Sequence, residues 1–149
     1  MGLKERLKED LTASMRSRDE VRTGTIRMVL TAITNEEVSG KEMRTLADAE
    51  IITVLSREAK KRREAAEAFD SAGSKDRADL ERKEGEIIAK YLPAQLSEAE
   101  LKEMIAAAIA ESGATGPAGM GLVMKVLSPK IAGRADGAAV SVAVKAALN

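Results

Sequence analysis

Cysteine and histidine are both absent from this protein, and tryptophan is absent as well. Without a thiol or an imidazole, the chain has no cysteine nucleophile, no Ser-His-Asp triad and no zinc site of the usual nitrogen and sulfur type. Disulfide bonds are excluded too, so nothing in the sequence indicates an oxidising compartment. We therefore name no catalytic residue, no metal ligand and no cofactor from the sequence.

Aromatic residues and net charge are also scarce. With one Phe and one Tyr, the chain lacks the rings on which RNA-binding surfaces usually stack unpaired bases. Its 24 basic and 24 acidic residues cancel, so any attraction for nucleic acid must be local. No apolar run approaches the roughly 18 residues of a membrane span, and the charged first residues do not resemble a signal peptide. We expect a cytoplasmic protein without a membrane partner.

What the sequence does contain is helical periodicity, because apolar residues recur at every third or fourth position along nearly all of it. Pro93 and the residues after it predict a boundary between two domains, 1–93 and 94–149. The predicted fold is all-α, with an N-terminal antiparallel helical bundle and a small C-terminal module of three helices. The expected helices cover about 3–16, 19–39, 45–73, 75–91, 97–113, 120–129 and 136–149.

Several helix ends have recognisable signals. Ser17 with Glu20, and Ser97 with Glu100, have the spacing of capping boxes. Gly40 suits the left-handed position that follows a helix. Pro129 is expected to end the short helix that starts near position 120.

Most charged residues suit the solvated faces of helices. This interpretation covers the basic run at 57–63, including Arg57, and acidic residues such as Glu84. Arg22 and Arg62 are different, since they fall within apolar arcs of their helices. Because an unpaired buried charge is costly, we favour ion pairs with carboxylates for both arginines over the alternative of anion binding.

The region after Gly113 has the one clear charge asymmetry, with four cations against the single acid Asp136. Glycines at 116, 119, 121 and 133 would allow a phosphate to approach the backbone, and a helix start near Met120 adds a partial positive charge. An equally weighted alternative is that these glycines only let three short helices turn tightly. The candidate RNA-binding residues are Lys125, Lys130, Arg134 and Lys145.

Four segments carry a family resemblance: RDEVRTGTIRMVLTAITNEEV, REAKKRREAAEAFDSAG, AKYLPAQLSEAEL and GMGLVMKVLSPKIAGRADG. Together and in this order, they resemble a YqeY-like protein of the GatB/YqeY family over nearly the whole chain. The resemblance implies a two-part helical fold whose C-terminal part is similar to the tail of the GatB subunit of the glutamine-dependent aminoacyl-tRNA amidotransferase. That tail helps to hold tRNA. Leu122 departs from similar sequences, which tend to have a lysine there.

The resemblance leads to three hypotheses of function. The first is an accessory module that binds tRNA or another structured RNA. The second is a helical adaptor that binds an amidotransferase component or another protein through exposed apolar surface. The third, ranked lowest, is the family label of a carbon–nitrogen ligase with glutamine as amido donor, because this chain lacks the catalytic domains of the larger enzyme.

Overall fold

A computed structural model describes residues 1–149 and contains seven α-helices, one short 3-10 helix and no strand, which confirms the all-α fold. The chain divides into two compact units, Met1–Leu92 and Pro93–Asn149, each with its own apolar core. The helices of the first unit are α1 (Leu3–Arg16), α2 (Glu20–Glu37), α3 (Asp48–Ser71) and α4 (Lys75–Ala89). Those of the second are α5 (Glu98–Ser112), the 3-10 helix η1 (Pro117–Gly119), α6 (Met120–Ile131) and α7 (Gly137–Leu148).

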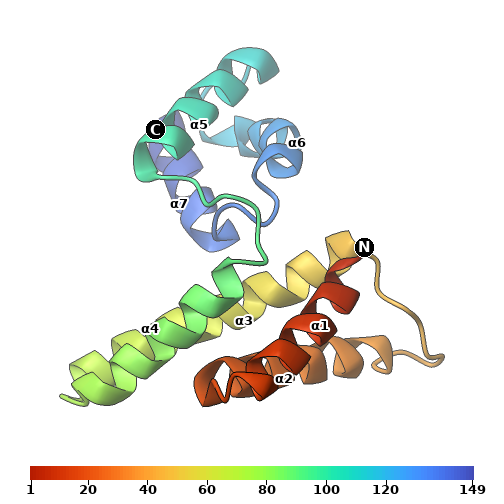
Figure 1. Cartoon of the computed structure of the whole chain (residues 1–149). Coiled ribbons are helices and arrows are strands. Elements are labelled where there is room, and N and C mark those ends of the chain that lie inside the picture. Colours follow the sequence, from red (N-terminus) through yellow and green to blue (C-terminus); the bar gives the residue numbers. More distant parts are fainter. The chain divides into compact units, whose positions relative to one another are not determined.

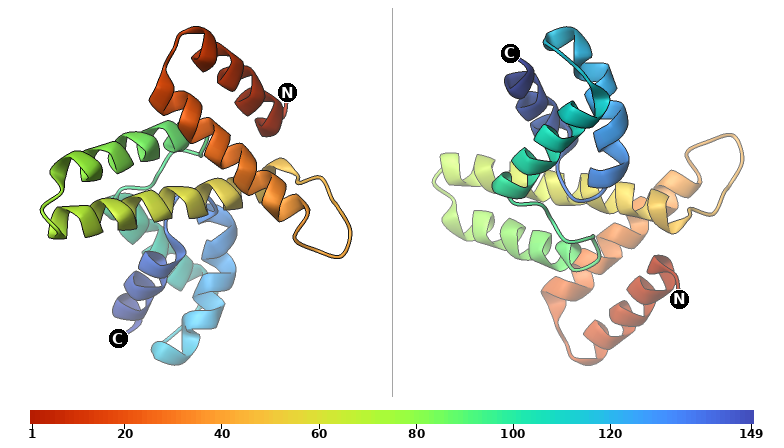
Figure 2. Two further views of the ribbon diagram at one scale, coloured as in Figure 1. Left: turned by 90° about the horizontal axis from the view of Figure 1, so that it is seen from below. Right: turned by 90° about the horizontal axis from the view of Figure 1, so that it is seen from above.

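The N-terminal unit is built from two antiparallel helical hairpins, α1 with α2 and α3 with α4 (Figure 1). Helix α2 packs against both α3 and α4, and Figure 2 shows it crossing this pair rather than running alongside it. The turn between α3 and α4 needs the positive φ of 77° at Gly73, which glycine adopts without steric cost. The core between the hairpins is aliphatic apart from the ring of Tyr91, and its largest fully buried side chains are Leu7, Ile26, Ile33, Ile51, Leu55 and Ile88.

Glu37 joins three parts of the N-terminal unit at the end of α2. Its side chain is 3% exposed, and its Oε1 accepts a bond of 2.6 Å from Lys4 Nζ on α1. Its Oε2 accepts the backbone N–H of Leu46 at 3.1 Å, so the same carboxylate also fixes the end of the loop that leads to α3. The bonds from Lys4 and Leu46 hold the pKa of Glu37 below its ordinary value.

Arg62 forms the ion pair expected for an arginine on a core-facing arc, which confirms that prediction. The residue is 9% exposed on α3, and its Nη1 donates to Glu58 Oε2 at 3.0 Å. Its Nε lies 3.3 Å from Glu84 Oε2 on α4. The interpretation of Glu84 as solvated is therefore wrong, and its burial and the neighbouring Glu81 carboxylate raise the pKa of Glu84 despite Arg62.

Arg22 pairs more loosely than Arg62 does. Its Nη2 lies 3.7 Å from Asp10 Oδ2 on α1, and its side chain is 38% exposed. Asp10 also accepts a hydrogen bond from the hydroxyl group of Tyr91. The predicted pairing with a carboxylate of a neighbouring helix is confirmed here as well, at the edge of the core rather than within it.

Two expected helix caps in the N-terminal unit are wrong. Asp19, not Ser17, caps α2 by accepting the N–H of Arg22 at 3.1 Å, because Ser17 instead donates to the carbonyl of Ser14. Gly40 does not adopt a positive φ, because α2 has already ended at Glu37.

The C-terminal unit packs α5, α6 and α7 around buried aliphatic residues of all three helices (Figure 1). Ser97 caps α5 as expected, accepting the N–H of Glu100 at 3.1 Å, and Gly113 ends the helix with a φ of 69°. Pro129 does not end α6, contrary to expectation. Its missing N–H removes only one bond, near the end of the helix, and burial of Ile131 favours one more half-turn.

The segment that enters the C-terminal unit is bonded to the loop between α6 and α7. The N–H of Leu96 donates to the carbonyl of Arg134 at 2.9 Å. The Gln95 side chain donates to the carbonyl of Gly133 at 2.8 Å, and Arg134 Nε donates to the carbonyl of Ala94 at 3.0 Å. The first residues after Pro93 are thus part of the folded module.

Candidate nucleic-acid interface

The glycines that precede and follow α6 have different structural roles. Gly116 and Gly133 adopt φ values of 69° and 73°, which favour glycine. A Cβ atom at the buried Gly119 would lie 2.6 Å from the Cβ of Ala114, so packing requires a glycine there. These three observations support the tight-turn alternative. Gly121 has neither constraint, because nothing lies within 4 Å of the position of its Cβ and its backbone is exposed.

Gly121 lies in the first turn of α6, where the helix has no side-chain cap. The N-cap residue is Gly119, which carries no side chain that could accept the first N–H groups of the helix. Leu122, next in the chain, is 56% exposed. The N–H of Met120 donates to the carbonyl of Pro117 in η1, so what the first turn of α6 offers an anion is the partial positive charge of a helix N-terminus and the open backbone at Gly121.

Lys125 and Lys145 are exposed and form no ion pair or hydrogen bond in the structure. Lys125 projects from α6 on the side opposite to the buried Val123 and Leu127, two residues away in either direction. Lys145 lies in the last turn of α7. Both ammonium groups are therefore available to a ligand without breaking an internal contact.

The other two predicted cations have partners within the C-terminal unit. Lys130 Nζ lies 3.1 Å from Glu111 Oε2 on α5, with the two side chains 53% and 61% exposed. Arg134 is half-buried, and its Nε is used in the bond to the Ala94 carbonyl. Arg134 therefore has a structural role that the sequence did not indicate. The four cations come from α6, α7 and the loop between these helices, and no hydrogen bond joins any two of them.

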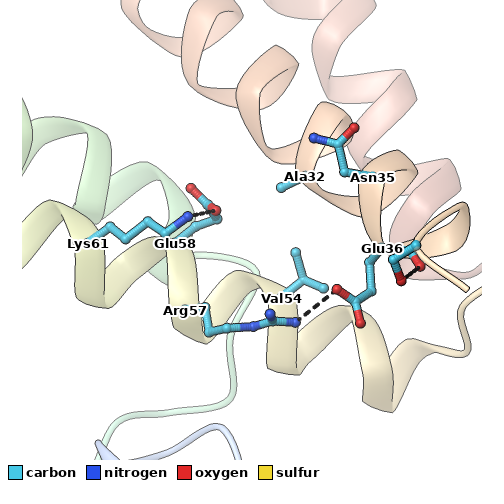
Figure 3. Close-up of a pocket in the computed structure, with 8 residues that line it drawn as sticks. Ala32, Asn35, Glu36, Val54, Arg57, Glu58 and Lys61 are labelled. Carbon is cyan, nitrogen blue, oxygen red and sulfur yellow. Dashed lines mark hydrogen bonds and ion pairs between the residues drawn. The ribbon is translucent and has the colours of Figure 1, made fainter.

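A polar pocket that the sequence did not predict lies between α2 and α3 in the N-terminal unit (Figure 3). Its volume is about 350 Å³, and it contains part of the basic run on α3. Figure 3 shows Arg57 reaching towards Glu36 on α2, with Arg57 Nη2 3.4 Å from Glu36 Oε2. Lys61 Nζ lies 3.1 Å from Glu58 Oε1. The lining residues are Ala32, Asn35, Glu36, Ser39, Val54, Arg57, Glu58 and Lys61.

The charges of this pocket cancel, since two cations face two carboxylates that already bind them. A phosphate entering it would meet Glu36 and Glu58 as well as Arg57 and Lys61, so the pocket is a weaker candidate for an anion site than α6 and α7 are. Sequence spacing alone did not reveal it, because Arg57 and Glu36 are 21 residues apart. No group of three or more carboxylates is arranged to hold a metal ion.

Comparison with known families shows to which family the chain belongs. The model of the family described as Yqey-like protein matches residues 4–148 of the chain. This chain belongs to that family. The YqeY-like match includes both units, and so the helices that carry all four candidate cations.

One curated relative of this YqeY-like chain is "Altered inheritance of mitochondria protein 41, mitochondrial" from Clavispora lusitaniae (strain ATCC 42720). The two are 34% identical over 101 residues, which is 66% of this chain and 58% of the relative. The match therefore spans little more than half of the relative's length. None of the helices here has both the length and the apolar character needed to cross a membrane.

Proposed function

We propose that this YqeY-like protein is an RNA-binding accessory module that contacts the phosphates of a structured RNA, tRNA above all, through its C-terminal unit. The observation that carries the proposal is the pair of exposed, unpaired lysines, Lys125 and Lys145, in a region with Asp136 as its only acid. An unpaired cation binds a phosphate without first losing an internal partner. Because phosphate contacts position a protein without reading sequence, such binding needs no aromatic ring.

Lys130 and Arg134 support the same surface. An exposed pair such as Lys130 with Glu111 contributes only about 0–1 kcal/mol, so a phosphate displaces Glu111 at little cost. Arg134 uses Nε for the Ala94 carbonyl, which leaves its two terminal nitrogens for a second acceptor. The exposed first turn of α6, around Gly121, adds the partial positive charge of a helix N-terminus.

The link from the family to tRNA rests on the resemblance of the C-terminal part to the GatB tail. The resemblance to the GatB tail implies contact with tRNA, and membership of the YqeY-like family is shown over 4–148. The adaptor hypothesis and the lower-ranked ligase hypothesis stay predictions. So does the cytoplasmic compartment, since the relative from Clavispora lusitaniae has a mitochondrial name.

Titration of a labelled tRNA transcript at several salt concentrations, followed by fluorescence anisotropy, tests the proposal. Four phosphate contacts should make log K fall against log salt with a slope of roughly −3 to −4. Lys125→Ala with Lys145→Ala should reduce the magnitude of that slope by roughly two units, because two counterion-releasing contacts are lost. Leu122→Lys adds a charge one helical turn from Lys125 and should make the slope steeper by about one unit.

The matched control is Arg63→Ala with Lys83→Ala in the N-terminal unit, which removes two exposed cations that form no ion pair. Affinity should change little in this variant. Arg134 requires a separate comparison, since Arg134→Ala also removes the bond to Ala94, whereas Arg134→Lys removes that bond and keeps the charge. Equal weakening by the control and by the double lysine variant would refute the proposed surface.

A further inference from the structure

Helix α7 is apolar on two opposite faces, which is unusual for a helix at the surface of a small module. Nine of its twelve residues are Ala, Val or Leu. Val140, Val144 and Leu148 pack into the core, but Val142, on another face, is 71% exposed. A helix that is apolar all round is normally buried on all sides. The outward apolar face of α7 therefore lacks a partner within the C-terminal unit.

A groove lies beside this face, between α7 and α5. It has a volume of about 760 Å³ and is lined mostly by aliphatic side chains. Leu101, Ile105 and Ile109 of α5 line it together with small residues, of which Ala106, Ala139, Ala146 and Ala147 are exposed. Val142 stands next to the groove, since it is three residues from Ala139 and four from Ala146 on the helix surface. A projecting apolar side chain and an apolar groove thus occur on one surface.

The only charges that line the groove are Glu98 and Lys102, one helical turn apart on α5. When two copies of such an edge run antiparallel about a two-fold axis, Glu98 of each copy meets Lys102 of the other. This is the reciprocal pairing that a two-fold interface requires. The same two charges can therefore pair with their counterparts in a second copy. In the same way, Val142 of each copy can enter the groove of the other.

We infer that the groove between α5 and α7 is the interface of a symmetric dimer, and that its occupant is the same surface of a second copy of this chain. The alanines of α7 allow close approach of the second copy, and Val142 enters the partner's groove. Lys145 lies about 160° around α7 from Ala143 and Ala147 but only three residues from Val142, so it lies at the edge of the proposed interface, whereas Lys125 on α6 lies outside the groove. The inference does not depend on RNA binding.

Sedimentation equilibrium of the full chain over a range of concentrations tests this inference. The expected mass is twice the 15.8 kDa of one chain. Ala106→Glu places a charge in the groove and should weaken the dimer by about tenfold or more, because the added carboxylate would be buried without a partner. The matched control is Ala107→Glu, in which the same charge is added to an exposed residue of α5 outside the groove. It should change the dimer affinity less than about threefold, in line with the small effects of surface substitutions.

A charge exchange distinguishes self-association from binding of another protein. Glu98→Lys and Lys102→Glu should each weaken the dimer, since each brings like charges together across the axis. The chain with both substitutions should recover most of the affinity, because both copies then carry the exchanged pair. Circular dichroism of each variant establishes that the helices are intact.

Three results would overturn the inference: a single-chain mass at every concentration, a dimer equally sensitive to Ala106→Glu and Ala107→Glu, or a doubly exchanged chain no better than the single variants. RNA affinity is measured separately on the same variants. A monomer that still binds tRNA with the predicted salt slope would refute the dimer alone, and a dimer without RNA binding would refute the RNA proposal alone.

Discussion

Replacing Arg62 with methionine should destabilise the N-terminal unit by about 3 kcal/mol, because breaking a buried ion pair from one side costs about 3–5 kcal/mol. The guanidinium is the group that Glu58 and Glu84 share, at 3.0 and 3.3 Å, and all three side chains are 11–17% exposed. The lower end of the range applies for two reasons. Glu58 keeps its contact with Lys61, and Glu84 accepts a proton more readily than an ordinary glutamate, since its pKa is already raised.

The expected loss converts to a large thermal shift. In a unit of this size, 1 kcal/mol lowers Tm by about 4–8 °C, so Arg62→Met should lower it by roughly 12–24 °C. The fluorescence of Tyr91 follows this unit alone, because the chain has one tyrosine, within Met1–Leu92, and no tryptophan. The deficit should shrink as the pH falls through the raised pKa of Glu84, because protonation of Glu84 removes the buried charge that has lost its partner.

A matched variant distinguishes the unpaired charge from the lost packing. Arg62→Met combined with Glu58→Gln and Glu84→Gln has no buried carboxylate left without a partner, so it should recover most of the stability. Urea unfolding at neutral pH measures both variants. If Arg62→Met lowered the free energy of unfolding by less than about 1 kcal/mol, the ion pairs of Arg62 would contribute no more than exposed pairs do, which would refute the reasoning. An equal loss in both variants would show that packing, not charge, is the cause.

Three further predictions concern other parts of the chain. Burial and the bond to Asp10 raise the pKa of Tyr91, so the absorbance of its phenol should titrate above pH 10 in the folded protein, and titration at or below pH 10 would contradict this prediction. The resulting stabilisation of the folded state is complete below pH 10 and is lost as the pH rises through the folded pKa. The lowered pKa of Glu37 stabilises the folded state, and this contribution is complete above pH 4.5 and lost as the pH falls through the folded pKa. Glu37→Gln should therefore melt at a lower temperature at pH 7 and lose less stability on acidification, and melting curves equal to those of the unchanged chain would argue against this role. A protease of broad specificity should cut first within the exposed residues 39–43, and mass spectrometry that instead finds first cleavage within 94–96 would contradict the bonding of that segment.

The helices could be predicted closely because their signals are local. Helix α1 has the predicted ends, Leu3 and Arg16, and Gly113 ends α5 as its position indicated. The errors at Ser17, Gly40 and Pro129 arose where two local signals compete or where packing decides. Asp19 is a better-placed cap than Ser17, and burial of Ile131 extends α6 beyond its proline.

The candidate site could be predicted only as a set of exposed cations. Sequence identified Lys125 and Lys145 as basic residues in a region poor in acids, and the structure leaves them unpaired. It could not show that Arg134 bonds to Ala94, 40 residues earlier, nor that Glu84 meets Arg62. Both contacts depend on how helices or loops pack, which periodicity within one segment does not specify.

Three bonds join residues 94–96 to Gly133 and Arg134 in the loop between α6 and α7, and so fix the first residues of the C-terminal unit. A fragment cut at Ser97 would lose those three bonds and leave Arg134 without its acceptor, whereas one cut before Pro93 would keep them all. A fusion of this module to an unrelated protein should therefore begin at Pro93, the first residue of the C-terminal unit. A module that begins at Pro93 carries with it all three bonds that fix its first residues.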